Sequence, residues 1–443
     1  MEDSDNGLKL NVDKFPLEQK HSTKYLIILT VILGLAHSLD EYTSLAPGMI
    51  QSSLIQEFFI NYGVSEQDAL QIMSLLGLVT IFLLFAILPY KGLMDKFGRK
   101  KIFIIAIIGM TLGVAIGATA PIYPIYYVGS IIASFFILND MQYVYINEEA
   151  PSHLRTQAFT SAKIIGLLAL LIVPLIRQFS ITETVENWRP ILYFPFFLGI
   201  VVLILSLLFL KESRAFVILK EDRKLHPDKY VKEKLNFRQA SRDFKVMPTW
   251  KQYKILIIHG VIWTFFALAN GTNEVFMDQA GILQSDKNIV FTISTICVGI
   301  AYFSNGQFAD RVGRKPAMVV NSTLVVLLLP LEFFAILNYN LWLAGIAQGL
   351  RIGAFWNSGD VRGIMVMENT PTRLRGFAQM YAGLWAFIPV ILSVLLNTLL
   401  LEFVTYTMEI SLIFGIPVNL ACAIIAFWKF KETKHVDITQ IQG

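Results

Sequence analysis

The stretch Gly306-Gln307-Phe308-Ala309-Asp310-Arg311-Val312-Gly313-Arg314-Lys315 has a counterpart earlier in the chain, Asp95-Lys96-Phe97-Gly98-Arg99-Lys100-Lys101. The aspartates of the two copies are 215 residues apart (310 − 95). A second pair of motifs, Glu148-x-x-Pro151-x-x-x-Arg155 and Glu368-x-x-Pro371-x-x-x-Arg375, repeats at an offset of 220 residues (368 − 148). Repeats this long are typical of membrane proteins built from two homologous halves, so we predict duplication of a six-helix membrane unit.

The composition is that of a membrane protein. The 443 residues are 55% hydrophobic and 16% charged, and they include 33 Phe, outside the range usual for soluble domains. A soluble helical protein would need polar faces at helical spacing, and the segment 102–118 has none. We therefore predict an all-α membrane protein with 12 transmembrane helices in two pseudo-symmetric six-helix bundles. The predicted spans are 24–45, 69–90, 102–119, 122–147, 157–177, 189–210, 254–276, 289–308, 317–337, 341–367, 377–399 and 409–429.

The basic residues are distributed unevenly between the two sides of the predicted bundle. One side collects 31 Lys and Arg, whereas the other holds only Arg177, Arg189 and Lys287. The positive-inside rule therefore predicts a multi-pass protein of the plasma membrane with both termini in the cytoplasm. The predicted domains are an N-terminal tail at 1–23, a first bundle at 24–211, a cytoplasmic linker at 212–252, a second bundle at 253–430 and a C-terminal tail at 431–443.

Two further motifs, Lys211-Glu212-Ser213-Arg214 and Lys431-Glu432-Thr433-Lys434, follow the sixth and twelfth predicted spans. Together with the four loop motifs they resemble the signatures of the major facilitator superfamily, and within it those of the sugar-porter and metabolite:proton symporter branches. The resemblance covers both halves and implies transport by alternating access, with the first, fourth, seventh and tenth helices around a central cavity. The sugar-porter double glutamine of the seventh helix is missing, which counts against a sugar as the substrate.

The loop motifs also predict a cytoplasmic gate. They combine acidic and basic residues at fixed spacing. Because acidic residues contribute nothing to the positive-inside rule, their presence indicates a role beyond membrane topology. The motif arginines can pair with the motif glutamates, and the resemblance implies that such a latch holds the halves together when the cavity opens outward. The alternative is anchoring by positive charge alone. The predicted gate residues are Asp95, Arg99, Glu148, Arg155, Gly306, Asp310, Arg314, Glu368 and Arg375.

The first predicted helix contains a cluster of titratable residues. Spacings of three and four residues place His37 on the same helical face as Asp40 and Glu41. An ionisable group inside a span needs a partner, water or a function, and a histidine beside a carboxylate suits reversible proton binding. The run Leu39-Asp40-Glu41-Tyr42-Thr43 resembles the acidic first-helix motif of metabolite:proton symporters. We predict proton coupling here, with Asp40 favoured; the alternative is that both acids are solvated at the outer interface.

The predicted substrate site is polar. Arg351 lies in the middle of the tenth helix, where a guanidinium could bind a solute carboxylate. A polar, glycine-containing stretch at 270–274 is expected to interrupt the seventh helix and line the cavity. Lys163 could form a structural pair with Asp140, and Trp356 either contacts the solute or packs at a helix crossing. The predicted substrate-binding residues are Asp140, Asn270, Asn273, Glu274, Arg351, Trp356, Asn357 and Asp360.

These features together predict a transporter and not an enzyme. The leading interpretation is proton-coupled symport of a small organic solute, an organic acid or a sugar-like metabolite. An exporter, a passive facilitator and a solute receptor that moves nothing are the alternatives. The expected partners are the solute, protons and the lipid bilayer, with a monomeric state, no nucleic acid, no metal and no cofactor; Cys297 and Cys422 are interpreted as packing residues.

Overall fold

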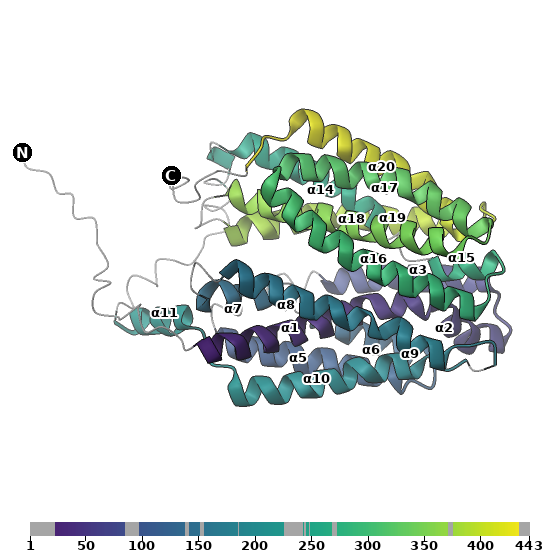
Figure 1. Ribbon diagram of the computed structural model, residues 1–443, viewed down its shortest axis with the longest axis horizontal. Coiled ribbons are helices and arrows are strands. Elements are labelled where there is room, and N and C mark those ends of the chain that lie inside the picture. Colours follow the sequence, from purple (N-terminus) through teal and green to yellow (C-terminus); the bar gives the residue numbers. More distant parts are fainter. Residues whose placement is uncertain are drawn as a thin grey trace, which may run out of the picture.

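The protein is a helical molecule made of two groups of helices. The computed structural model describes residues 23–84, 97–137, 141–150, 155–184, 186–225, 242, 245–247, 249–267, 273–370 and 375–433. Within these residues the elements are helices, apart from an isolated antiparallel bridge between Ile181 and Glu186. Figure 1 shows one group of helices coloured purple to teal and a second coloured green to yellow, running alongside one another. The predicted all-α fold is confirmed.

The first group is the N-terminal half of the chain. Its elements are α1 (Thr23–Leu45), η2 (Ala46–Met49), α2 (Gln51–Phe58), η3 (Ile60–Tyr62), α3 (Glu66–Leu84), α5 (Arg99–Ala118), α6 (Tyr123–Phe135), α7 (Met141–Glu149), α8 (Arg155–Leu170), α9 (Ile172–Ser180) and α10 (Arg189–Phe209). The helix α11 (Arg214–Leu225) follows it.

The second group is the C-terminal half. Its elements are α14 (Trp250–Ala267), α15 (Asn273–Gln279), α16 (Gln284–Arg311), α17 (Arg314–Leu337), α18 (Leu341–Glu368), α19 (Arg375–Leu400) and α20 (Thr407–Lys429). The halves meet where α3 contacts α19 and where α9 contacts α16.

Two predicted spans are each built from two shorter helices. Between α8 and α9 the reason is local, because Pro174 has no amide hydrogen and cannot donate to the carbonyl of Leu170. The amide of Leu171 bonds instead to the carbonyl of Leu168 at 3.2 Å, which tightens the turn at the break. The interrupted spans are 122–147 (α6 and α7) and 157–177 (α8 and α9), and the predicted interruption at 270–274 lies partly outside the described residues.

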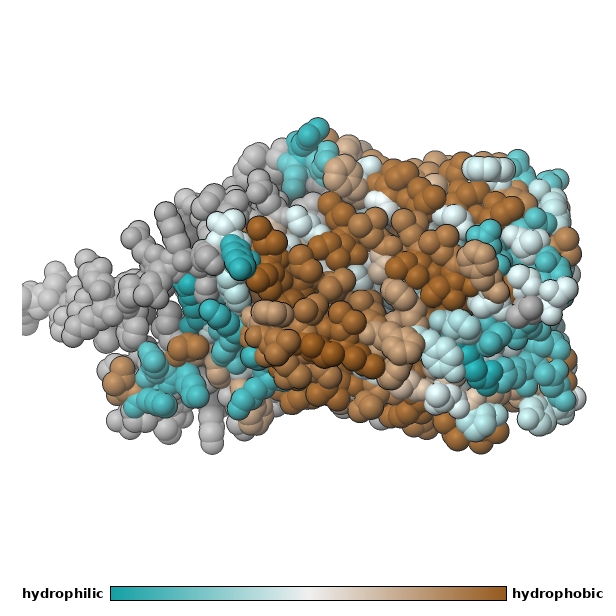
Figure 2. Space-filling view, turned by 60° about the horizontal axis from the view of Figure 1, so that its bottom comes forward, coloured by the Kyte–Doolittle hydropathy of each residue, from teal (hydrophilic) through white to brown (hydrophobic). Residues whose placement is uncertain are grey.

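The surface of the bundle fits a bilayer. Seven helices of the described residues are long and apolar enough to cross a membrane by length and composition. Figure 2 shows a broad hydrophobic band around the middle of the molecule, with hydrophilic residues toward both ends. Many large apolar side chains of the long helices are at least half exposed, among them Leu112, Phe197, Ile204, Leu327 and Phe427. Such a surface is stable in hydrocarbon and not in water.

The two ends of the bundle differ in the elements they contain. The start of α1, the helix α11 and the end of α20 lie at one end, which we call the terminal end, and α2 and α15 lie at the other, which we call the distal end (Figure 1).

At the terminal end, each half caps its third long helix with a glutamate from beyond its sixth. The Glu212 carboxylate accepts hydrogen bonds from the backbone amides of Arg99 (2.7 Å) and of the next residue (3.1 Å), at the start of α5. In the second half, Glu432 accepts from the amide of Arg314 (2.8 Å) and from the next amide (3.1 Å), at the start of α17. A carboxylate at a helix N-terminus satisfies amides that have no partner within the helix and interacts favourably with its dipole.

A glycine precedes each capped helix because no larger residue fits there. Gly98 has φ +106° and Gly313 has φ +139°, backbone angles that residues with a Cβ atom rarely adopt. A Cβ atom on Gly98 would lie 2.4 Å from Oε2 of Glu212, and one on Gly313 would lie 2.4 Å from Oε2 of Glu432. The repeated loop motifs and the repeated motifs after the sixth and twelfth helices are therefore two parts of one cap.

We expect Gly313→Ala to lower the thermal unfolding temperature of the detergent-purified protein. Backbone strain of this kind costs on the order of 1–3 kcal/mol, and the added methyl group collides with the capping carboxylate. Gly299→Ala is the matched control, because a Cβ at that helical position meets no atom within 4 Å. Equal unfolding temperatures for the two variants would show that the cap does not contribute to stability.

Candidate functional site

The predicted gate residues of the first half meet at the terminal end. The Arg99 guanidinium contacts both oxygens of Glu148, with Nη2–Oε1 at 3.0 Å and Nε–Oε2 at 3.1 Å. The hydroxyl of Ser213 donates to the same glutamate. Arg99 is the first residue of α5, and Glu148 lies in the last turn of α7. The ion pair therefore joins the third and fourth spans, and Ser213, which follows the capping Glu212, binds the same glutamate.

The second half repeats this arrangement. Arg314 Nη2 lies 3.6 Å from Oε1 of Glu368, and its Nη1 donates to Oδ1 of Asp310 at 2.6 Å. The hydroxyl of Thr433 donates to Glu368 as Ser213 does to Glu148.

These contacts bind together elements of one half. Each arginine contacts the glutamate of its own half, so the ion pairs do not themselves bridge the halves. Asp95 lies outside the described residues, as do the side chains of Arg155 and Arg375, and the surroundings of Gly306 are likewise not described. The role of this network as a gate between the halves stays a prediction.

A different ion pair does join the halves, at the distal end. Arg177 on α9 and Glu274 on α15 are both fully buried, with Nη2 and Oε1 2.6 Å apart. Arg177 also donates to the carbonyl of Met49 and to Oε1 of Gln284 (2.9 Å), and Oε2 of Glu274 accepts from the amide of Ser52 at 2.9 Å. Glu274 was predicted to contact the substrate; in this structure its carboxylate joins the two halves, and its contact with a solute stays a prediction.

Further hydrogen bonds between the halves surround this pair. They run from Gln67 to the carbonyl of Leu401 (2.9 Å), from Gln279 to Glu66 (3.0 Å), from the amide of Ser285 to Glu183 (3.0 Å) and from Asn288 to the carbonyl of Ile181 (3.1 Å). We call this set, together with the Arg177–Glu274 pair, the distal seal.

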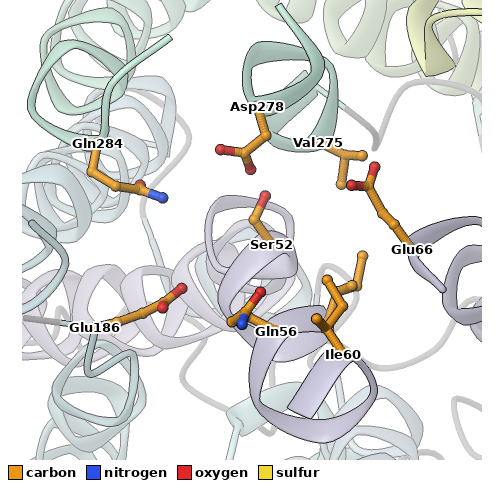
Figure 3. A pocket seen from close by; sticks show the side chains of 9 residues that line it. Ser52, Gln56, Ile60, Glu66, Glu186, Val275, Asp278 and Gln284 are labelled. Carbon is orange, nitrogen blue, oxygen red and sulfur yellow. The ribbon is translucent and has the colours of Figure 1, made fainter. Parts of the chain in front are cut away.

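A polar pocket of about 320 Å³ lies beside the distal seal. Figure 3 shows Asp278 and Gln284 of the second half across the pocket from Ser52 and Gln56 of the first. Glu186 also lines it, and burial raises the pKa of this carboxyl above its usual value, with the charge of Asp278 adding to the rise.

The sequence contained a signal for these distal contacts. Only three cations were assigned to this side, and each forms an ion pair: Arg177 with Glu274, Arg189 with Glu57 (2.6 Å), and the fully buried Lys287 with Asp278. The distal side has few Lys and Arg residues, so each one that occurs there could have been expected to have an acidic partner. Sequence reasoning counted these residues for topology and missed their structural role.

Arg351 is enclosed within the second half. Its Nε lies 2.5 Å from Oε2 of Glu332 on α17, and Asn273 donates to Oε1 of the same glutamate at 3.0 Å. Arg351 is 1% exposed and Glu332 is fully buried. The guanidinium is neutralised and shielded in this structure, and contact of Arg351 or Asn273 with a solute stays a prediction. Glu332, which the sequence left unexplained, is the partner that a buried arginine requires.

A second, more exposed ion pair also joins the two halves. Lys163 on α8 and Asp360 on α18 lie 3.4 Å apart (Nζ–Oδ2), with side chains 24% and 50% exposed, and the Lys163 ammonium lies 5.8 Å from the centre of the Tyr302 ring. Trp356, one turn before Asp360, is 40% exposed. Asn357 is buried and donates to the carbonyl of Ala301 at 3.2 Å, as expected of a residue at a helix crossing. Asp140 and Asn270 lie outside the described residues.

The titratable residues of α1 face α8. His37 Nε2 lies 3.7 Å from Oε1 of Glu41, and Gly166 leaves room for the imidazole, since a Cβ there would lie 2.2 Å from His37 Cδ2. Asp40 is buried, which does not support the alternative that both acids are solvated. Lys163 lies one turn before Gly166 on α8. The predicted proton-coupling residues and the Lys163–Asp360 pair are therefore both located where α1 contacts α8.

The comparisons with known proteins agree with this architecture. The family model of the Major Facilitator Superfamily matches residues 26–277, which are 252 of the 443 residues. No curated protein matches the sequence.

Solved structures of transporters superpose on nearly the whole chain. A D-xylose-proton symporter matches with a TM-score of 0.69 and 17% identity, over 93% of this chain and 99% of that one. The xylose transporter XylE from E. coli, in a partially occluded inward open conformation, matches with 0.69 and 16% over the same shares. A mutant of the nucleoside transporter NupG matches with 0.62 and 16%, over 91% and 100%. At these identities the likeness shows the fold alone; by its family match, the chain belongs to the Major Facilitator Superfamily and is a multi-pass membrane transporter, not an enzyme.

Proposed function

We propose that the protein moves a small organic solute across the plasma membrane by alternating access, as a monomer and in symport with protons. The terminal end, to which the basic loops belong, faces the cytoplasm in this proposal. The observation that carries it is the distal seal, in which a fully buried ion pair closes one end of the interface between the halves. An accessible charge pair lies in the interior of the same interface.

Alternating access needs two arrangements of the halves, and the distal seal favours one of them. To open the distal end, Arg177 must separate from Glu274 and both charges must be hydrated. Removing a single partner from a buried pair leaves an uncompensated charge, which is strongly destabilising for the arrangement that buries it. The ion pair therefore sets the balance between an inward-open and an outward-open state.

The coupling proton is proposed to bind the cluster on α1. His37 Nε2 lies 3.7 Å from a carboxylate oxygen of Glu41, Asp40 is buried on the same helix, and Lys163 belongs to the facing helix α8. Protonation changes the charge balance at the contact between α1 and α8, beside the pair that joins the halves. A structural neighbour is named as a D-xylose-proton symporter, which is consistent with coupling of this kind.

The transported solute is proposed to be an organic acid or a sugar-like metabolite. The structural neighbours are named for xylose and nucleoside transport. Because Glu332 neutralises Arg351 in this structure, we do not assign a solute carboxylate to that arginine.

We expect Arg177→Leu to open the distal end. A cysteine placed at Val275, which is 1% exposed, would report this opening by reacting with a membrane-impermeant maleimide, in a background without Cys297 and Cys422. Labelling should rise several-fold in Arg177→Leu. Arg189→Leu is the matched control because it removes a distal ion pair that lies within the first half. Equal labelling in the two variants would contradict the role of the distal seal.

Proton coupling is tested by flux in proteoliposomes that contain the purified full-length protein. With D-xylose, uridine or lactate as probes, the transported solute should accumulate when the outside is about one pH unit more acidic. His37→Gln together with Asp40→Asn should abolish accumulation while leaving solute exchange at equal pH. Flux of a probe that is indifferent to the pH gradient would identify a facilitator and refute symport.

A further inference from the structure

Arg362 on α18 carries a charge that the described part of the chain does not neutralise. Its Nη1 atom is buried and has no hydrogen-bond partner. Among the described residues, neither a hydrogen bond nor an ion pair holds this guanidinium, whereas Arg177 and Arg351 each pair with a fully buried glutamate. An arginine in a membrane span without a counter-charge is costly, so its presence indicates a function.

The nearest titratable groups do not supply that counter-charge. Asp360 is two residues earlier on α18, and at about 100° per residue it points to the other side of the helix. There it lies 3.4 Å from Lys163. His259 on α14 is fully buried, and both of its imidazole nitrogens lack a hydrogen-bond partner. An imidazole carries no negative charge in either protonation state, so the Arg362 donors stay available.

The guanidinium is held between two helices by an aromatic ring and two glycines. Its Cζ atom lies 4.6 Å from the centroid of the Trp263 ring on α14. A Cβ atom on Gly260 would lie 2.9 Å from Nη1 of Arg362, and one on Gly359 would lie 3.0 Å from Cζ2 of Trp263. The two glycines, one on each helix, therefore allow α14 and α18 to enclose the stacked pair.

The ring under the guanidinium is itself fixed. Trp263 stacks on Phe355 at 4.4 Å between centroids, and its Nε1 donates to the carbonyl of Phe355 at 3.2 Å. Stacking uses the face of a guanidinium and leaves the donors in its plane free for a ligand. Beside Arg362 there is open space, because a Cβ atom on Gly363 would meet no neighbouring atom within 4 Å.

We propose that Arg362 binds the carboxylate of a small organic anion, which provides the counter-charge that the chain does not. A guanidinium matches a carboxylate in bidentate geometry, and the stack on Trp263 presents it in one orientation. Trp356, which is 40% exposed and contacts Trp263 edge-on, adds an apolar surface one ring away from the cation. The inference rests on the proposed transport function and chooses the organic acid between its two substrate classes.

Binding is tested by thermal shift on the purified full-length protein. The probes are benzoate, lactate and succinate, and their neutral amides are the matched controls. Stabilisation reports binding. At least one carboxylate should stabilise the protein at a concentration about tenfold below that of its amide, as a hydrogen-bonded ion pair allows. Arg362→Gln should remove this difference, whereas Arg189→Leu at the distal end should keep it. No stabilisation by any carboxylate, or a preference that survives in Arg362→Gln, would overturn the inference.

Stability without a ligand separates a binding role from a structural one. Because Arg362 has no counter-charge to lose, Arg362→Met should unfold at a temperature equal to or above that of the unsubstituted protein. Arg351→Met is the matched variant on the same helix and should unfold several degrees lower, because Glu332 loses its partner. An equally large drop in Arg362→Met would show that this arginine is structural and would overturn the inference.

A third variant keeps the charge and disturbs only its position. Gly260→Ala places a methyl group against Nη1 of Arg362 and should raise the carboxylate concentration needed for stabilisation several-fold, with Gly299→Ala as the control. Unchanged carboxylate binding in Gly260→Ala would contradict the site. The proposed transport function fails separately, if proteoliposomes show no flux of any probe. Flux of D-xylose or uridine without carboxylate binding would uphold transport and overturn this inference alone.

Discussion

A charge inside a membrane protein needs a partner of opposite charge or contact with water, and this constraint organises the interior of the molecule. Arg351 is neutralised by Glu332 within the second half, and Arg177 by Glu274 across the interface. The first pair lies within one half, whereas the second joins the halves and must break if the distal end opens. The same physical requirement thus produces a contact within one half and a contact between the halves.

The duplication explains why the terminal end is so regular. Each half has a glutamate on the start of a helix, an arginine paired with a second glutamate and a hydroxyl bound to that glutamate. In sequence these groups are far apart, and only the fold brings them together. The distal end does not repeat in this way, because Arg177 and Glu274 come from different halves and have different surroundings. The repeated contacts at the terminal end stabilise each half separately. The Arg177–Glu274 pair at the distal end joins the two halves.

Much of the architecture could be predicted from the sequence. The lengths and spacing of the apolar segments gave the helices, and the repeated motifs gave the two halves. The glutamate and arginine motifs were expected to meet, and Arg99 does lie against Glu148. These features are local or repeated, so a pattern of residues along the chain is enough to reveal them.

The partners of the interior charges could not be predicted in the same way. Arg351 looked like a solute ligand because Glu332 lies 19 residues earlier on another helix, and helix rotation decides whether the two meet. The partner of Glu274 could not be predicted either, because Arg177 lies in the other half. Lys163 was matched with Asp140 as a candidate; Asp140 lies outside the described residues, and the structure places Asp360 3.4 Å from Lys163. Pairing between helices depends on their relative rotation and depth, which composition does not encode.

The caps on α5 and α17 also change where each half of the molecule ends. Glu432 and Thr433 lie beyond the last helix, yet they bind the start of α17 and the acid at the end of α18. A short segment that looks like the beginning of a tail is therefore a covalently attached clamp on its own bundle. Expression tags and deletions placed after Thr433 leave this clamp intact, whereas those that remove Glu432 take away a structural part of the second half.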